Sequence, residues 1–234
     1  IINYPCNPTG AIMDEETAKG LAQLLDERDI YLLSDEVYSN FVYDGARHVS
    51  VIEYMKDKDK AIYLNSFSKM FAMTGWRIAY VVANEKIVAA MSNITECGPS
   101  CFPEPTQLAA AKALDCCLGE IPVMKASYDR RRKLICGLLN EIPLISCRMP
   151  KGAFYAFVNI KALGVDDETF CMDLLHKKGV VLVPGSGFGS AGAGYVRISY
   201  ATSDENIHEG MRCCLKTETS ATASFPRRSC TTTR

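Results

Sequence analysis

Residues 61–80 read AIYLNSFSKMFAMTGWRIAY, and the rest of the fold is organised around this stretch. It opens with an apolar segment, 61–64, that is typical of a strand, and it soon reaches Lys69. Eight residues later Arg77 precedes a second apolar run, 78–83. Because apolar runs of this length are typical of strands in a core, we expect Lys69 to lie in a polar bend between two buried strands.

The side chains around this bend suit an anionic group that reacts with an amine. Lysine is rarely buried without a partner, and desolvation lowers its pKa and makes the amine nucleophilic enough to form a Schiff base. Ser66 and Ser68 supply hydroxyl donors, and Arg77 supplies a planar guanidinium that suits a phosphate. An amine beside a phosphate cradle is what pyridoxal phosphate requires. Taken by itself, Lys69 also fits a solvated loop lysine.

Strand, helix and strand follow one another at the start of the chain. The first strand ends in the turn 7–10, Asn-Pro-Thr-Gly, because proline lacks an N–H donor and glycine permits positive φ. A helical pattern over 14–28 has Asp14 as its N-cap, and an apolar run at 30–33 predicts the next strand. This order indicates an α/β fold with a mainly parallel sheet flanked by helices.

Polar side chains follow the strands of this predicted sheet. Asn7 comes after the first strand, and Asp35 and Tyr38 come after the second. Ligands of parallel sheets collect at the carboxyl ends of the strands. An aspartate directly after a buried strand needs a cation or hydrogen-bond donors, and a protonated pyridine nitrogen would be such a partner. A plain turn at Asn7 and a cap at Asp35 remain alternative interpretations.

Helical patterns dominate the middle of the chain, over 85–96, 104–118 and 120–141. The last of them carries a basic run at 129–133, Asp-Arg-Arg-Arg-Lys. Leucine and isoleucine flank this run at helical spacing, so we interpret it as a solvated helix face rather than a nucleic-acid site.

A change of composition near residue 141 predicts a domain boundary. Residues 1–141 would form the end of a large domain, and 142–216 would form a small α+β domain that includes a helix over 167–178. The Ser/Thr-rich tail, 217–234, has little to bury, and we expect it to be disordered.

The small domain contains a glycine-rich segment at 184–189 that precedes a strand rather than a helix, so a Rossmann motif is a poor interpretation. The predicted strand, 195–200, contains Arg197. An unpaired guanidinium inside a strand is costly, and the carboxylate of a ligand would satisfy it. A structural salt bridge is the alternative.

Composition excludes several classes of function. The 234-residue chain has a formal net charge of -1 and therefore no basic field for nucleic acid. Its apolar runs are shorter than the roughly 18 residues that a membrane-spanning helix needs. The 11 cysteines form no CxxC pair, which is typical of reduced thiols in a cytosolic protein. The three histidines are far apart in sequence, so no metal site is expected.

Together the motifs resemble the class I/II pyridoxal-phosphate aminotransferases of fold type I, over about residues 1–216. The segment AMTGWRIAY, residues 72–80, is most similar to the aspartate and aromatic aminotransferase subgroup. The motifs that carry the resemblance, in family order and spacing, are NPTG at 7–10, DEVY at 35–38, SFSK at 66–69, TGWR at 74–77 and YVRIS at 195–199.

The resemblance implies a role for each matching residue. Lys69 would hold the cofactor and move the proton between the substrate Cα and the cofactor C4′. Asp35 would keep the pyridine nitrogen protonated, and Tyr38 and Asn7 would bond the phenolic oxygen of the ring. The peptide bond before Pro8 is often cis in this family.

The remaining matches concern the two anions. Ser66 and Arg77, together with Ser68, would bind the cofactor phosphate, and Arg197 would bind the α-carboxylate of the substrate. Amino acids and 2-oxo acids are the implied substrates, and a homodimer is the implied full-length assembly.

The start of the sequence departs from the family pattern. The chain begins with Ile1 inside an apparent strand, without Met, and family members carry a long preceding segment. We therefore expect a C-terminal part of a longer protein. Two other functions remain open: a pyridoxal-phosphate-dependent carbon–sulfur lyase or related synthase, and a non-catalytic aminotransferase-like effector domain.

Overall fold

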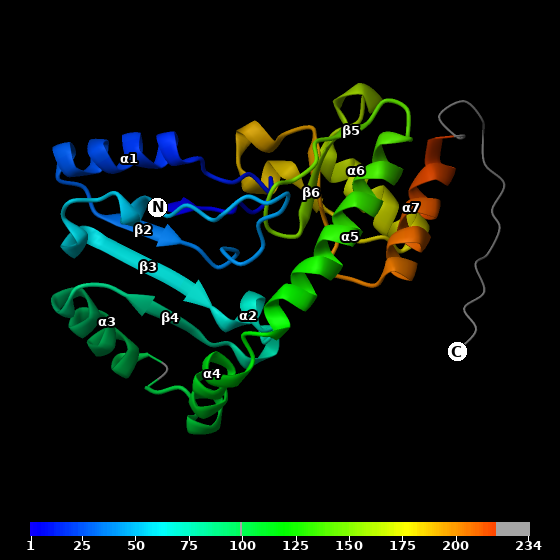
Figure 1. Ribbon diagram of the computed structural model, residues 1–234. Helices are drawn as coiled ribbons and strands as arrows, with labels where there is room; N and C mark the ends of the chain where they lie inside the picture. The colour runs from blue at the N-terminus through cyan, green and yellow to red at the C-terminus, as the bar shows by residue number, and fades with distance from the viewer. Residues whose placement is uncertain (99, 219–234) are drawn as a thin grey trace.

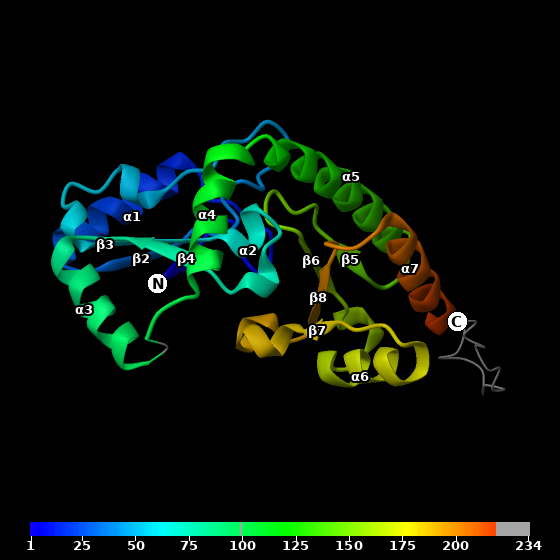
Figure 2. The ribbon, with the colours of Figure 1, turned by 90° about the horizontal axis from the view of Figure 1, so that it is seen from below.

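The computed structural model describes residues 1–98 and 100–218 of the chain (Figure 1). Two sheets lie side by side, and the long helix α5 (Glu120–Asn140) runs from the region of the first sheet toward the second in both views (Figures 1 and 2). Helix α7 (Asp204–Glu218) is the last described element. Most of the tail that was expected to be disordered lies outside the described residues.

The first sheet has the strand order β1-β2-β3-β4. Strands β1 (Ile2–Asn3), β2 (Leu32–Asp35) and β3 (Ala61–Ser66) are parallel, and β4 (Ala79–Val82) pairs with β3 in the antiparallel direction. The predicted α/β class with a mainly parallel sheet is therefore confirmed. Because β1, β2 and β3 run the same way, their carboxyl ends meet at one edge of the sheet.

Helix α1 (Glu15–Arg28) connects β1 to β2. As predicted, Asp14 caps it: the Asp14 carboxylate accepts from the backbone N–H of Thr17 at 2.7 Å. The helix ends at Asp29, which adopts the left-handed conformation. The side chains that α1 buries are those of Ala18, Ala22 and Leu25.

The second strand was predicted over 30–33, but this range was wrong by two residues. Tyr31 is 59% exposed and lies in the irregular segment between helix α1 and the strand. Strand β2 begins at Leu32 and pairs with β3 as far as Asp35. Asp35 is therefore the last residue of the strand rather than the first residue after it.

The segment around Lys69 also differs from the expected bend. A short helix, α2 (Phe67–Met70), starts directly after β3. The second strand of this region, β4, is not buried, and Val82 on it is 60% exposed. Strand β4 lies at an edge of the described sheet, and its neighbour along the chain, α3 (Glu85–Cys97), buries none of its described side chains.

The expected solvated face on α5 was wrong for one of its arginines. Arg132 is 1% exposed, and its guanidinium donates to the Asp44 carboxylate at 2.6 and 2.9 Å. It also donates to the Pro150 carbonyl at 2.7 Å. Arg132 lies three residues before Ile135 on the same buried stripe of the helix, which explains its burial. Arg130, in contrast, is exposed.

The second sheet is antiparallel and has the order β5-β6-β8-β7. Its strands are β5 (Ser146–Cys147), β6 (Tyr155–Asn159), β7 (Val183–Pro184) and β8 (Tyr195–Ser199). Helix α5 packs on β5 and β6, while α6 (Asp167–Lys178) packs on β7 and β8. The helix predicted over 167–178 is therefore confirmed.

One hydrophobic core joins the two sheets. Tyr38 and Phe41, which follow β2, are buried together with Phe154 and Tyr155 at the start of β6. Burial of such side chains contributes about 1.5 to 3 kcal/mol each. The segment after β2 is thus fixed against the second sheet, and the site lies along this junction. No helix among the described residues is long and apolar enough to span a membrane.

Candidate active site

The carboxyl ends of the parallel strands β1, β2 and β3 point toward the side of the molecule that holds the second sheet, and helix α4 (Glu104–Cys116) lies below the first sheet (Figure 1). Asn3 ties two of these ends together. It accepts from the Asn7 backbone N–H at 2.9 Å through Oδ1, and its Nδ2 donates to the Asp35 carbonyl at 3.2 Å. The Asn7–Pro8 peptide bond is cis, as the resemblance implied, and so is the Tyr4–Pro5 bond.

Lys69 lies on α2, where β3 ends. Ser66 caps this helix by accepting from the Ser68 N–H at 3.1 Å. The Lys69 Nζ lies 5.9 Å from the ring centroid of Tyr38 and 5.7 Å from that of Phe154. Partial burial lowers the pKa of Lys69, and the nearby positive charges add to the effect. A neutral, nucleophilic amine is therefore more accessible here than on a solvated lysine.

Those nearby charges belong to Arg197 and Arg77, in that order of effect on the pKa of Lys69. Arg77 is exposed and adopts a left-handed backbone conformation with φ 55°. Its Nη1 donates to the Thr74 carbonyl at 3.1 Å. The guanidinium that was predicted to hold a phosphate therefore stands on the same segment as the lysine.

The two serines of the predicted phosphate cradle differ in their surroundings. The hydroxyl of Ser66 donates to the Ile78 carbonyl at 3.2 Å, in addition to its role as the cap. Ser68 is buried on the first turn of α2. Ser66 and Ser68 therefore both lie at the start of the short helix that carries Lys69.

Asp35 is half-buried without a cation. Burial raises the pKa of its carboxyl, the negative charge of Glu36 raises it further, and the Val37 N–H at 3.3 Å opposes the shift. Within 1–98 and 100–218, no basic side chain forms an ion pair with Asp35. A cationic N–H donor would stabilise this carboxylate, which is what the sequence predicted for it.

Tyr38 presents a neutral phenol to the same region. Its hydroxyl lies 2.8 Å from the hydroxyl of Tyr155. Burial raises the pKa of Tyr38, and the bond to Tyr155 adds to the shift. The phenol therefore keeps its proton at neutral pH and remains a donor.

Arg197 on β8 reaches back across the molecule to the first turn. Its Nη1 donates to Asn7 Oδ1 at 2.8 Å, which joins residues 190 positions apart. The guanidinium carbon lies 4.6 Å from the ring centroid of Tyr155 and 5.1 Å from that of Phe188. The Nε of Arg197 is buried and has no hydrogen-bond partner in the described structure. An oxygen ligand such as a carboxylate would satisfy it.

These features fit pyridoxal phosphate. The lysine has a lowered pKa, the Asp35 carboxylate lacks a cation and the Arg197 guanidinium has an unused donor. Asn7 and Tyr38 border the same space with a carboxamide and a phenol. The structure therefore brings together Lys69, Tyr38, Asn7 and Arg197 directly, and places Asp35 and Ser66 at the neighbouring strand ends.

Sequence reasoning missed several residues that shape the site. Tyr155 supplies both a hydroxyl for Tyr38 and a ring for Arg197, yet it was noted only as part of an aromatic strand. Phe188 lies in the glycine-rich segment 184–189, which was considered only as a possible Rossmann motif. Asn3 was taken only as part of a strand.

A further missed residue is Asp167, the first residue of α6, which is 4% exposed. Its Oδ2 accepts from the Ser186 N–H at 2.8 Å, and its Oδ1 accepts from the Gly194 N–H at 3.2 Å. Burial alone would raise the pKa of this carboxyl, but the backbone donors outweigh it and lower the pKa to about 2.

This shift predicts a loss of stability in acid. The folded-state pKa of Asp167 lies below the value near 3.9 of an unfolded chain, so its contribution of roughly 2 kcal/mol is complete above pH 4. It is lost as the pH falls from about 4 to about 2. We expect the difference in unfolding free energy between wild type and Asp167→Asn to shrink over that window, measured by urea denaturation. The exposed Asp115→Asn is the control, and an unchanged difference at pH 2.5 would contradict the assignment.

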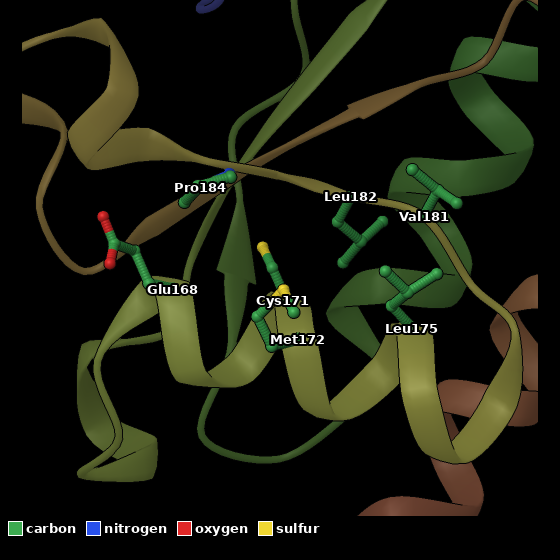
Figure 3. Close-up of a pocket in the computed structure, with 7 residues that line it drawn as sticks. All are labelled: Glu168, Cys171, Met172, Leu175, Val181, Leu182 and Pro184. Carbon is green, nitrogen blue, oxygen red and sulfur yellow. The ribbon is translucent and has the colours of Figure 1, made fainter.

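A pocket of about 250 Å³ lies elsewhere, between α6 and β7 (Figure 3). Its wall is mainly apolar with one carboxylate, that of Glu168, and none of the residues predicted for the site lines it. Without a cationic or hydroxyl group, this wall offers no anchor for a phosphate. The residues that line it are Glu168, Cys171, Met172, Leu175, Val181, Leu182 and Pro184.

Comparison with known proteins finds relatives that match nearly the whole chain. A family model described as aminotransferase class I and II matches residues 1–212. An aspartate aminotransferase of Pyrococcus horikoshii is 43% identical over 213 residues, which are 90% of this chain and 54% of that protein. An aromatic-amino-acid aminotransferase 2 of Thermococcus litoralis is also 43% identical, with the same coverage. The chain thus spans about half the length of these curated relatives.

Solved structures give the same result. The crystal structure of an aromatic aminotransferase from Pyrococcus horikoshii superimposes with a TM-score of 0.89 at 41% identity, over 94% of this chain and 59% of that one. An aspartate aminotransferase from Thermotoga maritima superimposes with a TM-score of 0.84 at 36% identity, over 93% and 56% of the two chains. The arrangement of the two sheets is therefore that of these enzymes.

Proposed function

This chain belongs to the class I and II aminotransferase family, and we propose on that basis that its protein moves an amino group between an L-amino acid and a 2-oxo acid. Members of the family use pyridoxal phosphate. The observation that carries the proposal is the placement of Lys69, with its lowered pKa, within the electrostatic reach of Arg197, whose Nε lacks a partner. Lys69 would hold the cofactor and take the proton from the substrate Cα, and Arg197 would bind the substrate carboxylate.

The cofactor, when bound, supplies an electron-withdrawing ring that accepts charge from the substrate Cα. Asp35 would hold the ring nitrogen in its protonated form, because its half-buried carboxylate lacks another cation. Asn7 and Tyr38 would bond the ring hydroxyl, and Lys69 would hold the cofactor through Nζ.

The phosphate would lie at the start of α2. Ser66, Ser68 and Arg77 would supply two hydroxyls and a guanidinium for it. Arg77 lies on the same segment as Lys69, and its positive charge contributes to the lowered pKa of the Lys69 amine. Binding of the phosphate by Arg77 would therefore be linked to that pKa.

Lys69 would also move the proton. A lowered pKa increases the neutral fraction of the amine, and the neutral amine can accept a proton from the substrate Cα and return it to a nearby carbon. The aromatic rings of Tyr38 and Phe154, each within 6 Å of Nζ, shield the amine from water. Such shielding strengthens the effect of the neighbouring charges.

Arg197 would bind the substrate α-carboxylate, and its replacement tests that role. We expect Arg197→Gln to raise KM for the 2-oxo acid and to lower kcat/KM by roughly 10²- to 10³-fold, because two charge-assisted hydrogen bonds are lost. Arg197→Lys should recover only part of this, since lysine lacks the planar fork. Arg148→Gln, an exposed arginine outside the site, is the control. Equal KM values for Arg197→Gln and wild type would contradict the role.

Several wider features belong to the same proposal. Residues 1–141 would be the C-terminal part of a fold type I large domain, and 142–216 the small α+β domain. The chain matches little more than half of the length of its relatives, which supports the proposal that the large domain is only partly present. A homodimer in the cytoplasm is the assembly and location that we propose for the full protein.

The test is an analysis of products in the full encoded protein supplied with pyridoxal phosphate. Aspartate and an aromatic amino acid are the first donors to try, because the relatives carry those names. We expect the ¹⁵N label of the donor to appear in the new amino acid formed from 2-oxoglutarate. Release of labelled ammonia would instead favour a carbon–sulfur lyase or related reaction, and no turnover with bound cofactor would favour an effector domain.

A further inference from the structure

A closed loop lies between β7 and β8, and Asp167 holds both of its ends. The carboxylate accepts from Ser186 N at the start of the loop and from Gly194 N at its end. The Gly194 carbonyl in turn accepts from the Ile160 N–H at 3.0 Å, which anchors the loop to the end of β6. A side chain on α6 therefore fixes a loop that begins about 19 positions later.

Glycine is required inside this loop. The backbones of Gly185 and Gly192 approach so closely that a Cβ atom on either would collide with the carbonyl of the other. Two short 3-10 turns, Gly185–Phe188 and Ser190–Gly192, fill the space between. With its ends fixed and its middle packed backbone to backbone, the loop has little freedom to shift.

Phe188 is the one large side chain that the loop presents to Arg197. Its ring lies on one side of the guanidinium at 5.1 Å, and the ring of Tyr155 lies at 4.6 Å. Tyr155 is buried on strand β6, so its position is set by the sheet. The position of Phe188, in contrast, is set by the loop, because Phe188 belongs to the turn Gly185–Phe188 and is 40% exposed.

We infer that Asp167 is a positioning residue for the substrate carboxylate site. It holds the loop, the loop places Phe188, and Phe188 keeps the Arg197 guanidinium oriented with its Nε free for a ligand oxygen. The inference rests on the proposed function, in which Arg197 binds the substrate carboxylate. Asp167 touches neither substrate nor cofactor.

The adjacent aspartate offers a matched control. Asp166 is the N-cap of the same helix and accepts from the Thr169 N–H at 2.8 Å, but it makes no bond to the loop. Asp166→Asn therefore disturbs the start of α6 while leaving the loop bonds intact. Asp167→Asn, in contrast, replaces one carboxylate oxygen by an NH₂ group that cannot accept from a backbone N–H.

The experiment measures the affinity for succinate by calorimetry in the full encoded protein loaded with pyridoxal phosphate. We expect Asp167→Asn and Phe188→Leu each to weaken binding about fivefold to tenfold, because the guanidinium loses its fixed orientation. Asp166→Asn should bind as wild type does. Hydrogen exchange should become faster at 185–194 in Asp167→Asn and stay unchanged in Asp166→Asn.

The double variant Asp167→Asn/Phe188→Leu tests the route of the effect. If Asp167 acts through Phe188, the double variant binds succinate no more weakly than Phe188→Leu alone. Multiplied effects would overturn the inference, as would an Asp167→Asn variant that binds like Asp166→Asn. Asp167→Ser, which keeps one oxygen acceptor, takes the place of the Asn variant if that variant does not fold.

Arg197→Gln separates this inference from the proposed function. If Arg197→Gln binds succinate as tightly as wild type, the carboxylate role of Arg197 and the proposal built on it both fail. If Arg197→Gln binds weakly while Asp167→Asn binds normally, the proposed function stands and only the positioning role of Asp167 is refuted. In turnover, the inference predicts a larger change in KM than in kcat for Asp167→Asn.

Discussion

Replacing Lys69 by alanine is expected to lower the rate of amino transfer by about 10⁴-fold or more. In the proposed function Lys69 both holds the cofactor and moves the substrate proton, so the variant would remove both, and loss of a general base alone costs typically 10² to 10⁴-fold. The measurement is kcat for formation of the new amino acid, at saturating pyridoxal phosphate. Lys69→Arg should be as inactive as Lys69→Ala, because a guanidinium does not become neutral near pH 7.

The control for this prediction is Lys86→Ala, which removes an exposed lysine on α3. It should transfer amino groups at the wild-type rate. Retention of more than a few per cent of wild-type kcat in Lys69→Ala would mean that another group moves the proton. The lowered pKa of Lys69 would then reflect only its burial beside two arginines.

Replacing Asp35 by asparagine is expected to lower kcat/KM by roughly 10²- to 10³-fold. The side chain keeps its shape but loses its charge, so the cofactor ring nitrogen would no longer be held protonated. Stability should behave differently. Because burial raises the pKa of Asp35, the ionised carboxylate is unfavourable in the folded protein, and asparagine removes that cost. Thermal unfolding of the cofactor-free variant should therefore occur at or above the wild-type Tm.

The combination of lower activity with unchanged or higher Tm is typical of a functional carboxylate. Asp115→Asn, an exposed aspartate on α4, is the control and should change neither property. A large fall in Tm for Asp35→Asn would instead assign Asp35 a structural role as a cap for the following turn. Full activity in the variant would exclude it as the partner of the ring nitrogen.

Local signals in the sequence predicted much of the fold. The cap at Asp14 and the helix over 167–178 were correct because capping residues and apolar spacing act within a few residues of each other. The same signals did not place Tyr31, which is apolar in the pattern but exposed after helix α1. Nor did they show that Arg132 is buried, because Asp44, its partner, lies 88 residues away.

The residues of the candidate site also differ in whether local sequence signals could predict them. The sequence could predict that Asn7, Asp35 and Lys69 lie near one another, because each is at or within a few residues of the carboxyl end of a strand and parallel strands end at a common edge. Asp167 and Phe188 could not be predicted, since their importance depends on contacts made by a loop with β8 and α6. An aspartate directly after another aspartate at a helix start was the available signal, because one carboxylate suffices for the cap.

The most direct test of the central claim is to locate the attachment of the cofactor. The full encoded protein is incubated with pyridoxal phosphate, reduced with borohydride, digested and mapped by mass spectrometry. We predict one pyridoxyl-labelled peptide, with the label on Lys69. A control sample without the cofactor should carry no label at that position. A label spread over surface lysines, with Lys69 unmodified in a folded sample, would contradict the assignment of this site.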